Sequence, residues 1–226
     1  MAYIVRKGLH YCCVGERIVF MDLRSDSYFM LMGTSDKAFR AYLADSEIND
    51  KDLEVLRARG ILLESDPTET EQPALDVPVP QRSASEISLA QETAGLKIIF
   101  EVARLVYTTR RALRTRNIGE LLDAHVDCCR GTERQVDVTR MDSDPDTFAR
   151  AAGQYRHARR FIPIEHSCLL DSLALDRFLA KRGLESRLVF GVNAEPFSAH
   201  AWLQAGDMAL NETVSYARMH TPILVL

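Results

Sequence analysis

A cysteine and a histidine 32 residues apart carry the side chains best suited to covalent chemistry in this sequence. Cys168 begins a run of leucines and alanines with helical spacing that ends at Gly183, so its thiol is expected on the first turn of a helix. Unpaired amides and the positive end of the helix dipole lower the pKa of a thiol there, and the thiolate is the nucleophilic form. The alternative is a small buried hydrophobic residue, a common role for free cysteine.

His200 is the candidate general base for this cysteine. It lies in a β-prone segment, Ser198-Ala199-His200-Ala201-Trp202, which would pack beside the cysteine helix if the order helix, strand, strand forms an α+β layer. The alternative is a histidine with only a structural role in the sheet.

A third group is needed to orient the imidazole ring and stabilise its charged form. A three-residue hairpin loop after His200 would place Glu212 opposite it. A two-residue Gly206-Asp207 loop would instead place Thr213 opposite it and Asn211 on the same face. Glu165, just before the cysteine helix, is a further candidate, and its simpler role is a carboxylate at a helix start. The residues alone leave these possibilities open.

The elements that must position these groups follow from hydrophobic spacing and turn residues in the second part of the chain. We expect helices at 87–113, 119–129, 145–156 and 165–182, then strands at 186–192, 199–204 and 208–211. The order of helices and strands predicts an α+β domain over residues 86–226.

The first part of the chain predicts a second, smaller domain over residues 1–65. Short β-prone runs at 9–14, 18–23 and 27–32 are separated by turns and predict a three-stranded meander. We expect a helix capped by Thr34 or Ser35 that runs to Leu43, and another capped by Asn49 that ends at Gly60. Phe39, Leu43, Leu53, Leu56 and Ile61 are the expected helix contribution to its core. Strands followed by short helices indicate a winged-helix shape.

A linker is predicted between the two domains at residues 66–85. This segment holds half of the eight prolines and, before Arg82, acidic residues without a basic one. Proline interrupts helices and strand pairing and like charges repel, so the segment is expected to be extended and solvated.

Composition excludes several classes of protein. The chain has 28 Lys and Arg against 32 Asp and Glu, a net charge of −4 that argues against nucleic-acid binding along the whole chain. The arginines at 110–116 and 156–160 are interpreted as solvated. Five cysteines without a CxxC pair, and no signal peptide, predict a cytoplasmic protein without disulfides. The longest apolar stretch, 96–107, is too short and too charged for a membrane span.

Cofactor motifs are also missing from the sequence. There is no GxxxxGK phosphate loop, and no set of His and Cys residues has the spacing of a zinc site. We therefore predict no cofactor and no metal.

Several spaced elements of the second domain resemble the lasso-peptide B protein family, which are leader peptidases with a transglutaminase-like, papain-type fold. They are the run 168–175, Gly191-Val192, Pro196-Phe197, Ala199–Trp202 and Leu210-Asn211. The resemblance covers about residues 90–226 and implies Cys168 as nucleophile and His200 as base. The family usually has Asn-Asp after the histidine strand; this chain has Asn211-Glu212, so the resemblance gives the acid role to Glu212.

The first domain resembles the small winged-helix domain that recognises leader peptides of ribosomally made natural products. The resemblance lies in the runs 20–23 and 28–31 and in the helix from Asp50, and it implies that a leader adds a strand to the third strand and packs against the last helix. The candidate contacts are Tyr28, Phe29, Met30, Leu31, Leu53 and Leu56. Their alternative role is core packing.

The sequence thus predicts a two-domain cysteine peptidase that cuts the leader from a lasso-peptide precursor before macrocyclisation. The expected partners are the precursor's leader and an asparagine-synthetase-like cyclase. An acyltransferase using the same Cys-His pair is one alternative, and a winged-helix regulator that binds DNA is another. The helix from Asp50 carries as many acidic as basic residues, which is unfavourable for a helix that faces phosphates.

Overall fold

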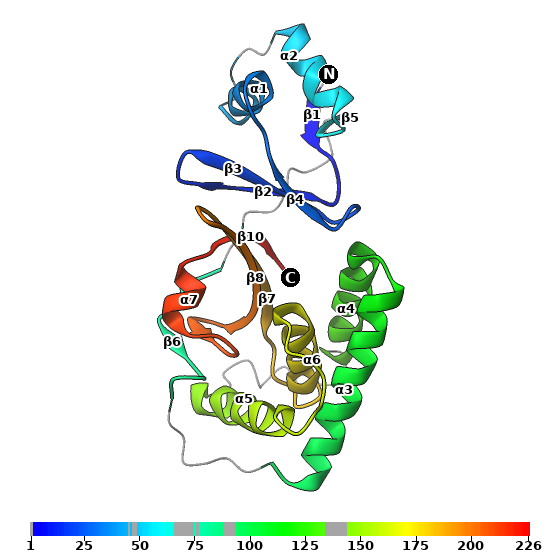
Figure 1. Cartoon of the computed structure of the whole chain (residues 1–226), viewed down its shortest axis with the longest axis vertical. Helices are drawn as coiled ribbons and strands as arrows, with labels where there is room; N and C mark the ends of the chain where they lie inside the picture. Colours follow the sequence, from blue (N-terminus) through cyan, green and yellow to red (C-terminus); the bar gives the residue numbers. More distant parts are fainter. Residues whose placement is uncertain are drawn as a thin grey trace. The chain divides into compact units, whose positions relative to one another are not determined.

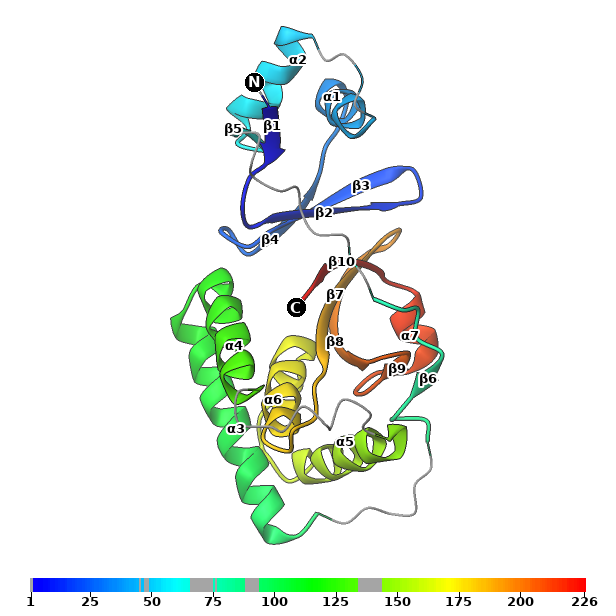
Figure 2. The ribbon, with the colours of Figure 1, turned by 180° about the vertical axis from the view of Figure 1, so that it is seen from behind.

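The computed structural model describes residues 2–44, 46, 49–65, 75, 77–87, 94–133 and 144–226. The chain divides into two compact units, Met1–Leu75 and Asp76–Leu226. The first unit has two sheets and the second has one, and each unit has its own helices (Figures 1 and 2).

The first unit contains the predicted meander. Three antiparallel strands lie in the order β2 (Leu9–Val14), β3 (Arg17–Asp22) and β4 (Ser27–Met30). Gly15, in the turn between β2 and β3, has a φ of 58°, a value that glycine adopts without strain. A second, two-stranded sheet pairs β1 (Ala2–Val5) with β5 (Leu62–Ser65) and was not predicted.

Two helices complete this unit, and one of them has the predicted caps. In α2 (Asp50–Ala58), the Asn49 side chain accepts a hydrogen bond from the Asp52 amide, and Gly60 follows with a φ of 64°. In α1 (Thr34–Leu43) the cap prediction is wrong: Gly33 is the N-cap residue, and the predicted caps lie inside the first turn.

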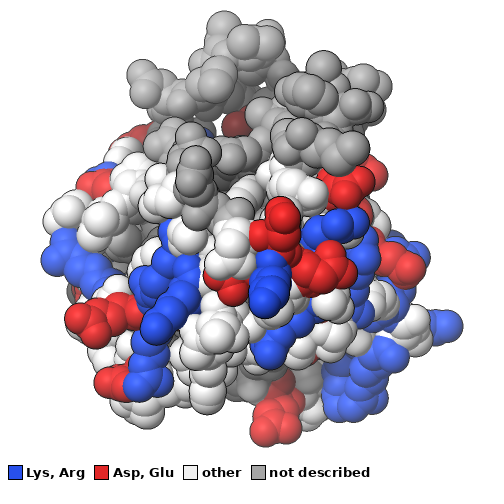
Figure 3. All heavy atoms as spheres, turned by 90° about the horizontal axis from the view of Figure 1, so that it is seen from above, with Lys and Arg blue, Asp and Glu red and all other residues white. Residues whose placement is uncertain are grey.

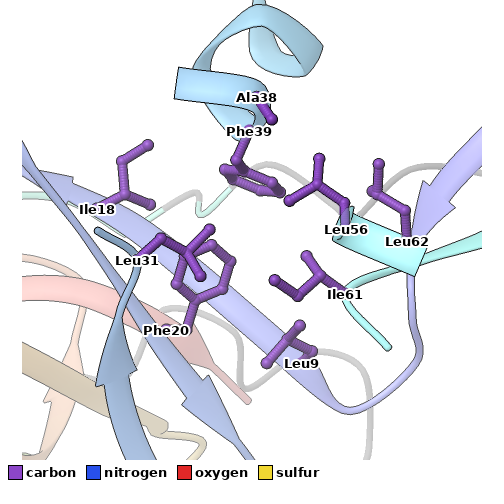
Figure 4. Close-up of a cluster of buried hydrophobic side chains, with 9 residues drawn as sticks. All are labelled: Leu9, Ile18, Phe20, Leu31, Ala38, Phe39, Leu56, Ile61 and Leu62. Carbon is purple, nitrogen blue, oxygen red and sulfur yellow. The ribbon is translucent and has the colours of Figure 1, made fainter. Parts of the chain in front are cut away.

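The core of the first unit lies between the meander and the two helices (Figure 4). It consists of Leu9, Ile18, Phe20, Leu31, Ala38, Phe39, Leu56, Ile61 and Leu62. The ring centroids of Phe20 and Phe39 lie 4.9 Å apart in an edge-on arrangement that favours aromatic contact. Leu43 was predicted in the core but is exposed. Leu53 is half-buried and packs against the core.

The second unit is built around one buried helix, α6 (Cys168–Ala180). It packs against three other helices and against two strands, so apolar residues cover most of its circumference. The surrounding helices are α3 (Leu96–Thr115), α4 (Ile118–Glu133) and α5 (Pro145–Arg159). These three helices and α6 were all predicted. Helix α3 starts at Leu96 and not at residue 87, and residues 88–93 lie outside the described part. Gly183 ends the α6 segment as predicted, with a φ of 67°.

A five-stranded sheet forms the other layer of the second unit, in the order β10-β7-β8-β9-β6. Its strands are β6 (Arg82–Ser83), β7 (Arg187–Ala194), β8 (Phe197–Ala205), β9 (Met208–Ala209) and β10 (Thr221–Val225). All neighbours are antiparallel except β6 and β9. A short helix, α7 (Val214–Arg218), connects β9 to β10.

The predicted linker extends too far toward the second domain. Residues 82–83 form β6, and the segment before it is held by side chains of the second unit: Gln204 donates to the Pro78 carbonyl and Arg218 to that of Pro80. The proline-rich composition predicted a solvated segment. Proline can nevertheless lie at the edge of a sheet, because there its carbonyl can accept a hydrogen bond and no amide is needed. Residues 66–74 and 76 lie outside the described part.

Gly191, on β7 of the five-stranded sheet, leaves no space for a side chain. A β-carbon there would lie 2.7 Å from Trp202 Cζ3 and 2.9 Å from His220 Cβ, and both neighbours are buried. Gly191→Ala is expected to destabilise the protein by about 1–3 kcal/mol, because neither side chain has room to move. Urea unfolding measures the change. Gly95→Ala, with no atom within 4 Å, is the control and should cost less than about 1 kcal/mol. Equal losses would show that the close contact is not the cause.

Candidate active site

Cys168 is the first residue of α6, and its side chain is exposed. A hydrogen bond with His200 is the largest influence on the thiol and lowers its pKa, against the opposing effect of burial. The backbone amides of Ala201 and Leu169 also favour the thiolate. Cys168 therefore lies on the first turn of a helix, as predicted. The amide of Ala201, on the neighbouring strand, lowers the pKa of its thiol further.

His200 lies on β8 and contacts both Cys168 and Glu212. Its Nε2 atom is 2.9 Å from Glu212 Oε2, an ion-pair contact without the alignment of a linear hydrogen bond. Burial lowers the pKa of His200, but the contacts with Cys168 and then Glu212 outweigh it and raise that pKa to about 9. Burial would raise the pKa of Glu212, yet the contact with His200 lowers it. Together these directions favour a thiolate, an imidazolium and a carboxylate.

Three aromatic rings hold the His200 imidazole in place. Trp202 is nearly parallel to it with centroids 6.2 Å apart, Tyr216 meets it edge-on at 4.9 Å, and His220 lies at 5.5 Å. His220 is itself fixed: its Nδ1 lies 3.0 Å from the Tyr216 carbonyl, which can only accept, and its Nε2 lies 3.1 Å from Ser198 Oγ. Neither Tyr216 nor His220 was predicted, because their contacts depend on how α7 folds back.

The hairpin register differs from the one that favoured Glu212, yet Glu212 still faces His200. Gln204 pairs with Ala209, which corresponds to the two-residue loop. The last backbone hydrogen bond of this hairpin joins the Leu210 amide to the Leu203 carbonyl at 2.9 Å, so beyond Leu210 the register no longer dictates which residue lies opposite His200. The chain bends, and Glu212 Oε1 accepts a hydrogen bond from the Thr213 amide at 2.9 Å while Oε2 contacts the imidazole. The prediction of a three-residue loop is wrong. The contact between His200 and Glu212 results from the bend after the hairpin and not from strand register.

Asn211 joins the strand hairpin to the cysteine helix instead of contacting His200. Its Oδ1 accepts from the Leu203 amide at 2.8 Å, and its Nδ2 donates to Ser172 Oγ at 2.9 Å. Ser172 is fully buried and donates in turn to the Ala201 carbonyl at 3.0 Å. Ser172 lies one turn after Cys168, so helical spacing could have indicated it as a residue of the same face.

The loop before α6 is organised by a buried arginine. Arg159 Nε donates to Asp171 at 2.6 Å, and its Nη atoms donate to the carbonyls of Ile162, Ile164 and Glu165. Its predicted solvated role is wrong, because the side chain is 3% exposed and ion-paired. The remaining Asp171 oxygen lies 2.9 Å from His166 Nδ1. These contacts fix the approach to Cys168, and Glu165 contributes its carbonyl to them.

The candidate leader contacts in the first unit fall into two groups. Leu31 and Leu56 are 7% and 0% exposed and belong to the core, so they do not line a surface. Tyr28, Phe29, Met30 and Leu53 are half-buried, and of these Phe29 and Leu53 also pack against the core. The first three lie on β4, whose one neighbour in the described sheet is β3.

Two properties of the described residues concern metal ions and membranes. No three His, Cys, Asp or Glu side chains are grouped so that they could hold a metal ion. None of the helices described combines the length and the apolar character that crossing a bilayer requires.

The ionisation of Cys168 can be tested without a substrate. Since the thiolate reacts with iodoacetamide, we expect half-maximal alkylation of Cys168 below about pH 8.5, the value for an unperturbed cysteine. His200→Ala should move this midpoint to higher pH because it removes the group that stabilises the thiolate. Glu212→Gln should move it in the same direction by destabilising the imidazolium. Mass spectrometry of the Cys168 peptide separates it from the other cysteines, and an unmoved midpoint in His200→Ala would contradict the assignment.

Comparisons with known proteins bear on this site. The microcin J25-processing protein McjB of Escherichia coli is 40% identical over 45 residues, which are 20% of this chain and 22% of that protein. This chain thus matches about a fifth of that relative's length, and the match supports the resemblance to lasso-peptide B proteins. No solved structure matches the chain. The family model of the transglutaminase-like superfamily matches residues 105–225, which include Cys168, His200 and Glu212. Because this match spans more than half of the chain, the protein belongs to the transglutaminase-like superfamily.

Proposed function

We propose that the protein is a cysteine peptidase that cleaves the leader from a lasso-peptide precursor. The observation that carries the proposal is the contact of Cys168 with His200 and of His200 with Glu212, in which the pKa of the thiol is lowered and that of the imidazole raised. A thiolate paired with an imidazolium supplies both a nucleophile and a proton donor. The similarity to a microcin-processing protein supports a peptide substrate.

In the acylation step, the Cys168 thiolate attacks the carbonyl carbon of the scissile bond and a carbon–sulfur bond forms. The carbon–nitrogen bond then breaks, and the His200 imidazolium gives its proton to the leaving amine. That amine is the new N-terminus of the core peptide. The first amides of α6 have no acceptor within the helix, which makes them the candidate donors to the oxyanion that develops on the carbonyl oxygen.

In the deacylation step, neutral His200 takes a proton from water as the water oxygen attacks the thioester. The carbon–sulfur bond breaks, so the thiolate and the imidazolium are restored and the leader leaves with a new carboxylate. Glu212 keeps the imidazole oriented in both steps and stabilises its charged form. The thiol must stay reduced between turnovers, which supports action in the reducing cytoplasm.

We further propose that the first unit binds the leader at β4. An extended leader would pair with the open edge of this strand, with affinity from backbone hydrogen bonds and specificity from Tyr28, Phe29, Met30 and Leu53. Met32, which follows the strand, is 77% exposed and extends the apolar surface available to a peptide. A winged-helix assignment for this unit stays a prediction.

The expected downstream partner is an asparagine-synthetase-like cyclase that consumes the freed core peptide. An acyltransferase would use the same residues with an amine in place of water, and the mass of the product distinguishes the two. The DNA-binding alternative is disfavoured: on the face in Figure 3, basic and acidic side chains are interspersed, and α2 carries Asp50, Asp52 and Glu54 beside its basic residues.

The catalytic proposal predicts the behaviour of Cys168 and His200 as a unit. Cys168→Ala should abolish cleavage of the precursor encoded beside the gene, His200→Ala should be about as damaging, and the double variant should be no worse. The alkaline limb of kcat/KM should fall near pH 9, where the imidazolium loses its proton. Single-turnover cleavage followed by mass spectrometry measures all three variants. Cleavage that persists in Cys168→Ala would refute the mechanism, and additive losses would argue against the pair.

The binding proposal predicts a difference between the two edges of the three-stranded sheet. Met30→Pro removes an amide from β4 and should weaken leader binding at least tenfold, as measured by fluorescence anisotropy with a labelled leader. Cys13→Pro makes the same change on β2, the opposite edge, and should leave binding within about twofold. Circular dichroism of both full-length variants checks that they fold. Equal effects on two folded variants would contradict binding at β4.

A further inference from the structure

The outer face of α3 carries apolar side chains that the packing of the second unit does not use. In Figures 1 and 2 this helix runs along the edge of the unit, with α6 between it and the sheet. It packs against α5 and α6, and its buried residues are Val102, Leu105, Val106 and Thr109. Leu96 and Phe100 are instead 74% and 73% exposed, and Tyr107 is 53% exposed.

These exposed apolar residues have the spacing of a coiled-coil seam. Successive gaps of four, three and four residues separate the members of this α3 seam, which are Leu96, Phe100, Ala103 and Tyr107. In a helix with 3.6 residues per turn, this spacing keeps the four side chains within a sector of about 60°. Single exposed apolar residues are common, but a regular stripe of them on the solvent side indicates an interaction surface.

A row of cations runs along one side of the α3 seam. Lys97, Arg104 and Arg111 are spaced by seven residues, so they share one heptad position beside the seam. All three are exposed, and among the residues that the structure describes none of them has a carboxylate at ion-pair distance. Arg110 and Arg114 continue the line of the seam at its C-terminal end. Charges at such positions form salt bridges with a partner helix and thereby select it.

Helix α3 does not neutralise these charges itself. It has five basic residues and one acidic residue, Glu101, whose carboxylate pairs with Lys181 at 3.5 Å and Arg182 at 2.9 Å. A second copy of the chain would not supply the missing carboxylates. In an antiparallel pair the row of cations would face the same row of the other copy, and in a parallel pair it would face the heptad position of Ile99 and Val106. The acidic residues must therefore come from a different protein.

We propose that the α3 seam binds an amphipathic helix of another protein, with apolar residues at heptad spacing and acidic residues facing the row of cations. Packing into the seam buries apolar surface, Ala103 allows a close approach, and the ion pairs set the direction of the bound helix. The apolar sector is too narrow for a membrane surface, because helices that lie on bilayers present a broad apolar face. Neither Cys168 nor His200 lies on α3, so the inference does not rest on the peptidase function.

Binding of a designed helical peptide to the full-length protein tests the proposal. The probe is a stapled peptide of about three heptads, with leucine at both seam positions and glutamate at the positions beside them. Fluorescence anisotropy of the labelled peptide should show saturable binding, and Phe100→Gln should weaken it at least tenfold because apolar burial in the seam is lost. Phe161→Gln makes the same change at a phenylalanine of the second unit that is 60% exposed, and it should alter affinity less than twofold.

Charge reversal tests the row of cations separately. Lys97→Glu/Arg104→Glu should weaken binding of the acidic peptide at least tenfold, and this variant should instead favour a peptide with lysine in place of glutamate. Lys37→Glu/Lys51→Glu changes the net charge equally from exposed positions of the first unit and should have less than a threefold effect. Circular dichroism checks that every variant folds.

The absence of binding at 0.5 mM acidic peptide would overturn the proposal, and so would equal losses in a seam variant and its control. Two other occupants of the face are tested with the same Phe100→Gln variant. A dimer in analytical ultracentrifugation that this variant abolishes would assign the face to a second copy of the chain. Sedimentation with vesicles of phosphatidylglycerol and phosphatidylcholine that the variant abolishes would assign it to a lipid surface. Either result would overturn the assignment to a partner helix.

Discussion

The fully buried hydroxyl of Ser172 links the helix that carries Cys168 to the strand that carries His200, the two residues on which all the proposed chemistry depends. It donates to the carbonyl of Ala201, next to His200, and accepts from Asn211, which in turn holds the Leu203 amide. A buried hydroxyl without partners would cost about 1–3 kcal/mol, so these bonds favour the arrangement of helix and strand seen here. Cys168, one turn earlier on the same helix, is thereby brought against the imidazole.

The acid member of the site depends on a segment that composition alone assigns to a linker. Ser83 and Ser85 donate through their hydroxyls to the Glu212 carbonyl, at 2.6 and 3.2 Å. They hold the bend that follows β9, and from that bend the carboxylate reaches His200. The two-residue pairing of β6 with β9 is long-range and parallel, so neither residue periodicity nor turn residues signal it.

Sequence was most informative where the signal is local. The Asn49 cap, the glycines that end α2 and α6, and the turns of the meander each depend on the conformational preference of one or two residues, and each was predicted. The β1–β5 pair links the two ends of the first unit and was missed. The residue opposite His200 was not predictable from strand pairing either. The Asn211 side chain takes the Leu203 amide, so the strand pairing ends where the prediction extended it.

The ionisation of the site is a property of the positioned residues and not of any one of them. Burial alone would raise the pKa of the Cys168 thiol and lower that of the His200 imidazole, which favours the neutral pair. Their mutual contact reverses both directions, and Glu212 adds to the effect on the imidazole. The charged pair therefore exists only while the two groups touch, since each supplies the counter-charge of the other. The hydrogen bonds of Ser172 and Asn211, which hold the helix against the strand, thus support the contact on which both pKa shifts depend.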